Sequence, residues 1–397
     1  MRFTVNRLEL LEAVKTALRA VSANKIIPVL SGVLIEADAD SGTLSVIGTD
    51  IRTQIQSRLK CMHISESGSG VFYPLLAAML KQLPGDTVEF TAGDGKNRYA
   101  EIQSGSCHYS VPFLPGNEFP KTHIPFPEDF IAVKGLNSLI RRTVFAADDK
   151  STDPNRASMQ FVKLTFAGGN TRAEATDGNC VAVSDSPHCG GGNMELILHK
   201  KALQMLSGIV KPDEELYVGT VGKFAMFLKA DLFFATMMHE GNYFEGSRLV
   251  ERIQPTYKAT VDAKQFYELV ENAATILGVS DDKCVTLHIR DGHLAIQSVT
   301  ATGSGTAQID ATNTVPTPDS GFHYVPKYLL NCLSHAQGPV NLSIDGRGAM
   351  LLEANQSRFI VCPRGPVHIH VKEPEKPKAT KPKAAKSKKP KTAAKAA

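Results

Sequence analysis

The sequence lacks several features that direct a chain to particular classes of protein. It has no tryptophan, and aromatic residues make up 7% of its 397 residues. It has no apolar run near the ~18 residues that suggest a membrane-spanning helix. Its first residues, MRFTVNRLEL, include Glu9 and contain no apolar signal-peptide core. We therefore expect neither a membrane protein nor an exported one, and the low aromatic content gives little support to base stacking on single strands.

Motifs of catalysis and metal binding are also missing. The sequence contains neither a G-x-x-x-x-G-K-[ST] loop nor a G-x-S-x-G nucleophile elbow. His368 and His370 alternate as metal ligands do, and Asp148, Asp149 and Asp153 form an acidic cluster. No third ligand stands at zinc-like spacing. We therefore interpret the histidine pair as part of a solvent-facing strand and the aspartate cluster as a solvated turn. We expect no catalytic residue, no cofactor and no metal site.

The cysteines do not form a disulfide framework. They are seven in number, which is odd, they are scattered, and they form no C-x-x-C pair: Cys61, Cys107, Cys180, Cys189, Cys284, Cys332 and Cys362. This pattern favours a reducing, cytosolic compartment in which the thiols act as small buried apolar groups. Cys180 and Cys189, which flank a turn, receive the same interpretation.

What the sequence does contain is a long repeat. FTVNRLELLEAVKTALRAV begins at Phe3, IAVKGLNSLIRRTVFAA at Ile131 and ATVDAKQFYELVENAATIL at Ala259, each start 128 residues after the last. Each copy has a short apolar strand, a polar link and a run with helical period; in the first copy the apolar positions are Leu8, Leu11, Val14, Leu18 and Val21. Because a period of this length is domain-sized, it predicts three similar domains.

Later features recur in the same order. Thr49-Asp50 and Thr176-Asp177, each inside a strand pair, lie 127 residues apart, whereas the third copy has no Thr-Asp. A second helix is predicted near residues 73–85, 199–210 and 325–338, closed by Gly85, Gly208 and Gly338. Gly/Pro/aromatic turns mark boundaries near residues 124 and 252. The fold class is α+β, with two helices and about eight short strands in each of three tandem domains: 1–124, 125–252 and 253–371.

The remaining segment, 372–397, differs in composition from the rest. It contains ten lysines and two glutamates, which give it a net charge of +8. The whole chain has a formal net charge of +4. Residues 1–371 therefore contain 34 basic and 38 acidic residues, a net charge of about −4. With no large apolar residue, the segment is predicted to be a disordered tail. It either solubilises the protein, binds DNA through its charge or competes with partner peptides.

Basic residues recur on the predicted helices of the acidic body. Lys15 and Arg19 share one helix face, and Arg141 and Arg142 lie within the first helix of the second copy. These helices either face an anionic partner or form ordinary solvated surfaces; the third copy, with Glu268 and Glu271, favours the latter. If the partner is nucleic acid, contact with a duplex backbone independent of base sequence fits best.

Together with the three α+β copies, IPVLSGVLIEA at Ile27, GTD at Gly48, ATDG at Ala175 and FIVCP at Phe359 resemble the bacterial DNA polymerase III beta subunit, the sliding clamp. The resemblance covers residues 1 to about 366. It implies a ring-forming DNA-clamp fold: a head-to-tail homodimer whose six domains surround double-stranded DNA. Such a ring tethers the DNA polymerase for processive synthesis and has no chemistry of its own. Implied partners are the DNA polymerase, the clamp loader and repair proteins with clamp-binding peptides, in the cytoplasm at the replication fork.

The resemblance also implies site residues. The peptide-binding groove corresponds to Met159, Thr176, Gly178, Asn179, Cys180, Val181, Phe244, Arg248, Leu249, Ile360, Val361, Cys362, Pro363 and Arg364. Domain-junction packing is the alternative role for these positions. The implied DNA contacts are Arg19, Lys25, Arg141, Arg142, Arg156 and Lys200, and the implied dimer contacts are Tyr109, Val111, Ile276 and Leu277. The main alternative function is a non-ring scaffold protein that binds DNA through its basic tail.

Overall fold

The computed structural model describes residues 1–21, 27–93, 98–148, 152–187, 190–277, 283–300 and 303–365. Several residues singled out from the sequence lie outside these ranges: Lys25, Asp149, Cys189, His368, His370 and the whole segment 372–397. Among the described residues, no helix is long and apolar enough to cross a lipid bilayer.

The chain folds as three structural repeats. The first contains β1 (Arg2–Asn6), α1 (Arg7–Leu18), β2 (Val33–Asp38), β3 (Thr43–Thr49), β4 (Thr53–Lys60), β5 (His63–Glu66), β6 (Gly68–Phe72), α2 (Leu75–Gln82), β7 (Thr87–Ala92), β8 (Tyr99–Ser104) and β9 (Cys107–Pro115). The second contains β10 (Ile131–Lys134), α3 (Leu136–Arg141), β11 (Phe161–Ala167), β12 (Asn170–Thr176), β13 (Cys180–Pro187), β14 (Met194–His199), α4 (Lys200–Ser207), β15 (Glu215–Val221), β16 (Phe224–Lys229) and β17 (Leu232–Met237).

The third repeat follows a short helix, α5 (Gly246–Arg252). It contains β18 (Tyr257–Asp262), α6 (Ala263–Leu277), β19 (Val285–Arg290), β20 (His293–Thr300), β21 (Gly303–Asp310), β22 (Thr312–Val315), β23 (Phe322–Tyr324), α7 (Pro326–Leu333), β24 (Pro339–Ile344), β25 (Met350–Ala354) and β26 (Ser357–Val361). Short 3-10 turns lie at Pro28–Ser31, Gly116–Glu118, Val144–Ala146 and Pro154–Gln160. In its described part, each repeat has two main helices and eight or nine strands, as the sequence predicted.

Helix α1 illustrates why the repeated segment folds as predicted. The side chain of Asn6 accepts hydrogen bonds from the backbone N–H groups of Leu8 (2.9 Å) and Glu9 (3.1 Å), which caps the helix. Leu11 and Val14 are buried, in agreement with the predicted apolar face. Leu8 is 53% exposed, so its assignment to that face was wrong: it stands in the first turn, at the open end of the helix.

The predicted glycine ends of the second helices were only partly right. Gly208 follows α4 directly as its C-cap, but with φ −82°, so it is right-handed and not the left-handed cap that favours glycine. Helix α2 ends at Gln82, and α7 ends at Leu333, so Gly85 and Gly338 lie beyond the caps. Gly338 has φ +68° and forms the turn into β24 instead.

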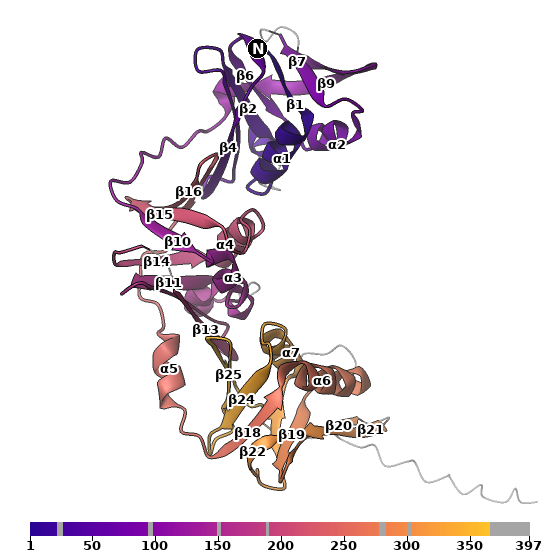
Figure 1. The fold of residues 1–397 in the computed structure, drawn as a ribbon, viewed down its shortest axis with the longest axis vertical. Coiled ribbons are helices and arrows are strands. Elements are labelled where there is room, and N and C mark those ends of the chain that lie inside the picture. The colour runs from indigo at the N-terminus through magenta and orange to yellow at the C-terminus, as the bar shows by residue number, and fades with distance from the viewer. Residues whose placement is uncertain are drawn as a thin grey trace, which may run out of the picture.

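The described strands form three sheets, and two of them cross from one repeat to the next. In the first junction, Thr53–Ser57 of β4 pair antiparallel with Leu232–Thr236 of β17. In the second, Cys180–Ser184 of β13 pair in the same way with Ser357–Val361 of β26. Figure 1 shows the three repeats in a curved row, joined at these strands. The two junctions are therefore copies of one arrangement.

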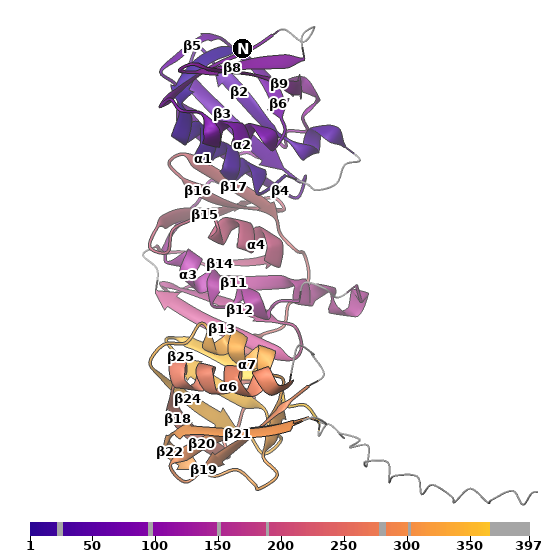
Figure 2. The same cartoon turned by 90° about the vertical axis from the view of Figure 1, so that its right-hand side faces the viewer.

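The helices lie on one side of the curved row. Figure 2, which views the molecule from that side, shows α1, α2, α3, α4, α6 and α7 following one another from the first repeat to the third. In Figure 1 the same helices occupy the concave side, and α5 lies on the opposite side. The concave side is therefore a surface of helices, backed by sheets.

Candidate DNA and partner interfaces

The Thr-Asp turns of the first and second repeats have the same hydrogen bonds. Thr176 Oγ1 donates to the carbonyl of Cys180 (2.8 Å), and Asp177 Oδ1 accepts from the Cys180 N–H (2.8 Å). In the first repeat, Thr49 Oγ1 donates to the Thr53 carbonyl (2.8 Å), and Asp50 Oδ1 accepts from the Thr53 N–H, at 2.6 Å. Each turn leads into the strand that crosses to the next repeat, so the motif positions the junction.

At the second junction, part of the predicted groove forms an apolar cluster. Val181 and Ile360 are buried beside Val183, Val250 and Leu351, and Phe244 and Ile253 pack against them. The chain approaches closely here: a Cβ on Gly246 would lie 2.9 Å from Val183 and 3.1 Å from Val181. Helix α5, which the sequence analysis missed, thus covers β13. Leu249 (37% exposed) and Arg248, which pairs with Glu245, lie on its outer side.

A second group of groove residues surrounds the turn between β12 and β13. Gly178 has φ +86°, a conformation that favours glycine, and a Cβ added there would lie 3.6 Å from the side chain of Met159. The backbone N–H of Cys362 donates to the Asn179 carbonyl (2.9 Å). Arg364 is exposed, and its N–H donates to the carbonyl of His323 (2.8 Å).

The remaining groove residues divide by burial. Thr176, Cys180 and Val361 are buried, so their side chains support the junction, while Pro363 is half-buried. The structure thus brings the predicted set together around one junction but exposes only part of it. The role of the set as a groove stays a prediction.

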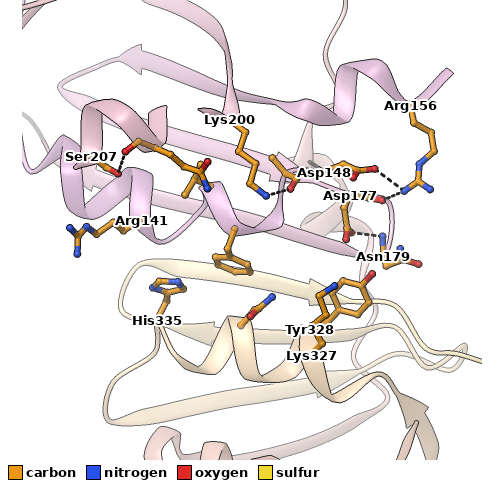
Figure 3. Close-up of a pocket in the computed structure, with 15 residues that line it drawn as sticks. Arg141, Asp148, Arg156, Asp177, Asn179, Lys200, Ser207, Lys327, Tyr328 and His335 are labelled. Atoms are coloured by element: carbon orange, nitrogen blue, oxygen red, sulfur yellow. Dashed lines mark hydrogen bonds and ion pairs between the residues drawn. The ribbon is translucent and has the colours of Figure 1, made fainter. Parts of the chain in front are cut away.

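The concave side of the same junction contains a cavity of about 860 Å³. Figure 3 shows Arg141 and Lys200 from the second repeat facing Lys327 and Tyr328 of α7 and His335, which follows that helix. His335 stacks on Phe145 (5.0 Å between ring centroids), and burial together with Arg142 and Arg141 lowers its pKa, so it is neutral at pH 7. Burial and the nearby Asp177 raise the pKa of Tyr328 to about 12, so its phenol stays protonated.

The predicted DNA contacts differ in their exposure. Arg19 and Arg141 are exposed on the concave helices. Arg142 is half-buried and donates from Nε to Ser184 Oγ (2.9 Å). Lys200 is only 7% exposed, and its Nζ donates to the carbonyl of Ala147 (2.6 Å).

Arg156 is also engaged within the protein. It donates to the Asp177 carbonyl and pairs with Asp148 at 3.5 Å (Figure 3). Arg142, Arg156 and Lys200 are thus bonded within the second repeat, which leaves Arg19 and Arg141 as the exposed members of the set among the described residues.

The structure adds a cavity of about 560 Å³ at the first junction, which the sequence analysis missed; Asp50 and Glu240 line it beside three cations. Arg52, Lys201 and Lys223 line it and are exposed. Within the described part of the chain, no ion pair joins these three cations to a carboxylate. Phe161 lies between His199 (5.3 Å) and His239 (4.4 Å) in the same wall. Burial and the neighbouring Lys201 and Arg52 lower the pKa of His199. The sequence feature that could have indicated this cavity is the pair of adjacent lysines, Lys200 and Lys201.

The predicted dimer contacts lie near two strand edges. Strand β21 pairs with β20, and among the described strands no other strand pairs with it. At the opposite end of the row, β9 pairs with β8 along its length, but with β6 only at Phe113–Pro115. Ile276 is 43% exposed and faces β21 at Gly305. Tyr109 is half-buried, whereas Val111 and Leu277 are buried in their own repeats.

Comparisons with known sequences agree with this architecture. The family model for the DNA polymerase III beta subunit, N-terminal domain, matches residues 1–124. The beta sliding clamp of Bacillus subtilis (strain 168) is 26% identical over 370 residues, which cover 88% of this chain and 94% of the relative. The beta sliding clamp of Staphylococcus aureus (strain Mu50) is 24% identical over 346 residues, which cover 84% of this chain and 89% of the relative.

Solved structures show the same fold. The B. subtilis DNA polymerase sliding clamp has a TM-score of 0.81 at 23% identity, covering 92% of this chain and 99% of that one. A putative DNA polymerase III beta subunit from Eubacterium rectale has a TM-score of 0.82 at 17% identity, covering 92% and 100%. With the repeated junctions and the helical concave face, these similarities show that the chain has the fold of the beta sliding clamps and is similar to them in sequence along most of its length.

Proposed function

We propose that this chain is a non-catalytic DNA sliding clamp that works as a head-to-tail homodimeric ring around duplex DNA. The ring tethers the replicative DNA polymerase and recruits partners through the groove at the second junction. The observation that carries this proposal is the repetition of the junction: two copies are made within the chain. Among the described strands, the strands for a third copy keep an open edge at the two ends of the row: one whole edge of β21, and the part of β9 before Phe113 on the side of β6.

The third junction follows from the equivalence of the strands. Within their own repeats, β4, β13 and β21 are each the end strand of a sheet, and β9, β17 and β26 are the last strands of the three repeats. Since β4 pairs with β17 and β13 with β26, the remaining pair is β21 with β9. A repeated heterologous contact closes into a ring when its rotation allows. Two chains of three repeats complete such a ring.

The concave helices would face the DNA. Arg19 and Arg141 are exposed there, and the cavity with Arg52, Lys201 and Lys223 adds cations at the first junction. Duplex DNA is bound through its phosphates by such groups, without reading of the base sequence. Lys25 and the tail 372–397 lie outside the described residues and remain predictions as DNA contacts.

Partner binding is proposed at the second junction, where apolar side chains are partly exposed. Leu249 and Phe244 lie beside the cluster of Val181 and Ile360, and such a surface suits a short apolar or aromatic peptide. The proposed occupants are peptides of the DNA polymerase, the clamp loader and repair proteins.

We further propose the domain limits 1–124, 125–252 and 253–371. The family model that ends at residue 124 supports the first limit. The proposed site of action is the replication fork in the cytoplasm.

The experiment is retention on DNA after loading by the cognate clamp loader. The protein is loaded on nicked circular DNA, and the complex is then passed through a sizing column in high salt. A topological link survives salt that screens ionic contacts, so the protein should co-elute with circular DNA and be lost once a restriction enzyme linearises the DNA.

Equal loss from circular and linear DNA would contradict the ring. A monomer whose DNA affinity disappears when residues 372–397 are removed would support the scaffold alternative instead.

A further inference from the structure

Two cysteines from different repeats meet in the second junction. Cys180 is the first residue of β13, and Cys332 lies in α7 of the third repeat. Their Sγ atoms are 3.7 Å apart, although the residues are 152 positions apart in sequence. Both are buried, with exposures of 1% and 0%. The two thiols are therefore in contact with each other and shielded from solvent.

The first junction shows that the fold does not require thiols at these places. By the strand register, Thr53 stands where Cys180 does. By the helix bounds, Leu206 is the seventh residue of α4, as Cys332 is of α7. Thr53 Oγ1 there makes a hydrogen bond of 3.0 Å with Thr236, and Leu206 is buried. Since other side chains fill the equivalent space, the thiol pair is a property of the second junction alone.

We propose that Cys180 and Cys332 form an oxidisable dithiol, which a peroxide converts to a disulfide that covalently links the second and third repeats. The Sγ atoms must approach from 3.7 Å to about 2.05 Å. This inference does not depend on the ring, because both cysteines belong to one chain.

The reaction balances with hydrogen peroxide as the oxidant. One thiol loses its proton, and the thiolate attacks a peroxide oxygen. The O–O bond breaks, and the leaving hydroxide takes up that proton, so that a sulfenic acid and one water result. The second thiol then attacks the sulfenic sulfur, the S–O bond breaks, and a second water leaves as the S–S bond forms. Two thiols are oxidised, and one peroxide is reduced to two waters.

Burial sets the rate of this step. Contact with Cys332 and burial raise the pKa of Cys180 well above its usual range, so little thiolate is present in the closed junction. Oxidation therefore needs transient opening of the contact between β13 and α7. Once formed, the disulfide fixes the position of Cys180 between Asn179 and Val181, and so stiffens the turn of the proposed groove.

The test is peptide mapping of the full chain after exposure to hydrogen peroxide under native conditions. Free thiols are alkylated without reductant, the chain is digested, and linked peptides are identified by mass. The expected product is a Cys180–Cys332 linked peptide, 2 Da lighter than the sum of its parts. Because the link constrains the unfolded chain, the thermal midpoint of the oxidised protein should rise by about 5 °C and return on reduction.

Matched variants separate this outcome from general oxidation. Cys332→Ala and Cys180→Ala should each abolish the linked peptide and the rise in midpoint, while Cys61→Ala, which removes a half-buried thiol of the first repeat, should change neither. The inference is overturned if wild type yields only singly oxidised cysteines or other pairings, or if the midpoint shift persists in Cys332→Ala. The wild-type protein alone can show singly oxidised cysteines or other pairings, so the proposal can be overturned even if a variant fails to fold.

Discussion

The two junctions of this chain share a backbone but differ in the side chains that occupy it. Five residues of one strand pair with five of the next repeat at both places, after the same Thr-Asp turn. The first junction presents Gln54 and Gln56 where the second presents Val181 and Val183. Helix α5 covers the valines in an apolar cluster, whereas the glutamines line a mixed polar cavity. Strand pairing therefore holds the repeats together at both junctions, while the side chains give each junction a different surface.

The largest loss of stability should come from substitutions in the buried core of the sheets that both junctions share. Phe234 and Phe359 are fully buried at equivalent places in the crossing sheets, opposite Ile55 and Ala182. Replacing either one by alanine removes a large core side chain, so each variant should lose about 4 kcal/mol of unfolding free energy. Chemical denaturation measures this loss. A cost at one junction several-fold smaller than at the other would break the claim that the two are equivalent.

A smaller effect should reveal the difference between the junctions. Val181→Gln places an amide in the cluster of Val183, Val250 and Ile360, so we expect a loss of about 2 kcal/mol and weaker binding of the cognate polymerase. The matched change is Gln54→Val, which gives up one 3.3 Å hydrogen bond from Thr122 and should cost about 1 kcal/mol or less.

Denaturation and surface plasmon resonance give the two readouts. Equal loss of polymerase binding in Val181→Gln and Gln54→Val would contradict the assignment of the groove to the second junction.

The turns themselves provide a third test. Ile51 and Gly178 occupy the same place in the two Thr-Asp turns, with φ +77° and +86°. A β-branched residue is strained in this conformation, and Ile51 is 51% exposed. Ile51→Gly should therefore stabilise the protein by about 1 kcal/mol, whereas Gly178→Ala should destabilise it by about as much. The thermal unfolding midpoints of the two variants should shift in opposite directions. A shift in the same direction would show that backbone strain at positive φ does not explain the two residues.

The smallest effect concerns the exposed cations of the concave side. Arg141→Glu should leave the folding stability within about 0.5 kcal/mol of wild type but reduce DNA affinity, and should lower the slope of log affinity against log salt. Arg248→Glu, on α5 at the opposite side, is the matched control and should not change that slope. Fluorescence anisotropy with a labelled duplex over a salt series measures both. An unchanged slope in Arg141→Glu would remove it from the interface.

The sequence predicted the repeats well because their signals are periodic. Apolar spacing and the Thr-Asp turns recur at about 127 residues, and the structure places these segments as equivalent helices, strands and turns. Helix α5 was missed because it has only seven residues and begins at Gly246, without a capping side chain. Short helices of this kind are stabilised mainly by what they cover, here β13, and the local sequence does not contain that information.

Site residues were harder to predict, because exposure depends on contacts distant in sequence. Arg141 and Arg142 are neighbours, but successive helical residues differ by about 100° in direction. Arg141 is exposed, and Arg142 packs toward Ser184. Lys200 resembles a surface lysine in sequence, yet its ammonium donates to the Ala147 carbonyl across 53 residues. The cavity with Arg52 and Lys223 escaped notice for the same reason, since its cations come from two repeats.

The most direct test of the ring is the mass of the protein in solution, measured by light scattering on wild type, Ile276→Arg and Val315→Arg. Both positions are 43% exposed, but Ile276 faces the open strand β21, and Val315 lies on β22 at the edge of another sheet. We expect about 86 kDa, twice 42.9 kDa, for wild type and Val315→Arg, and about 43 kDa for Ile276→Arg. A wild-type mass of about 43 kDa at every concentration would contradict it.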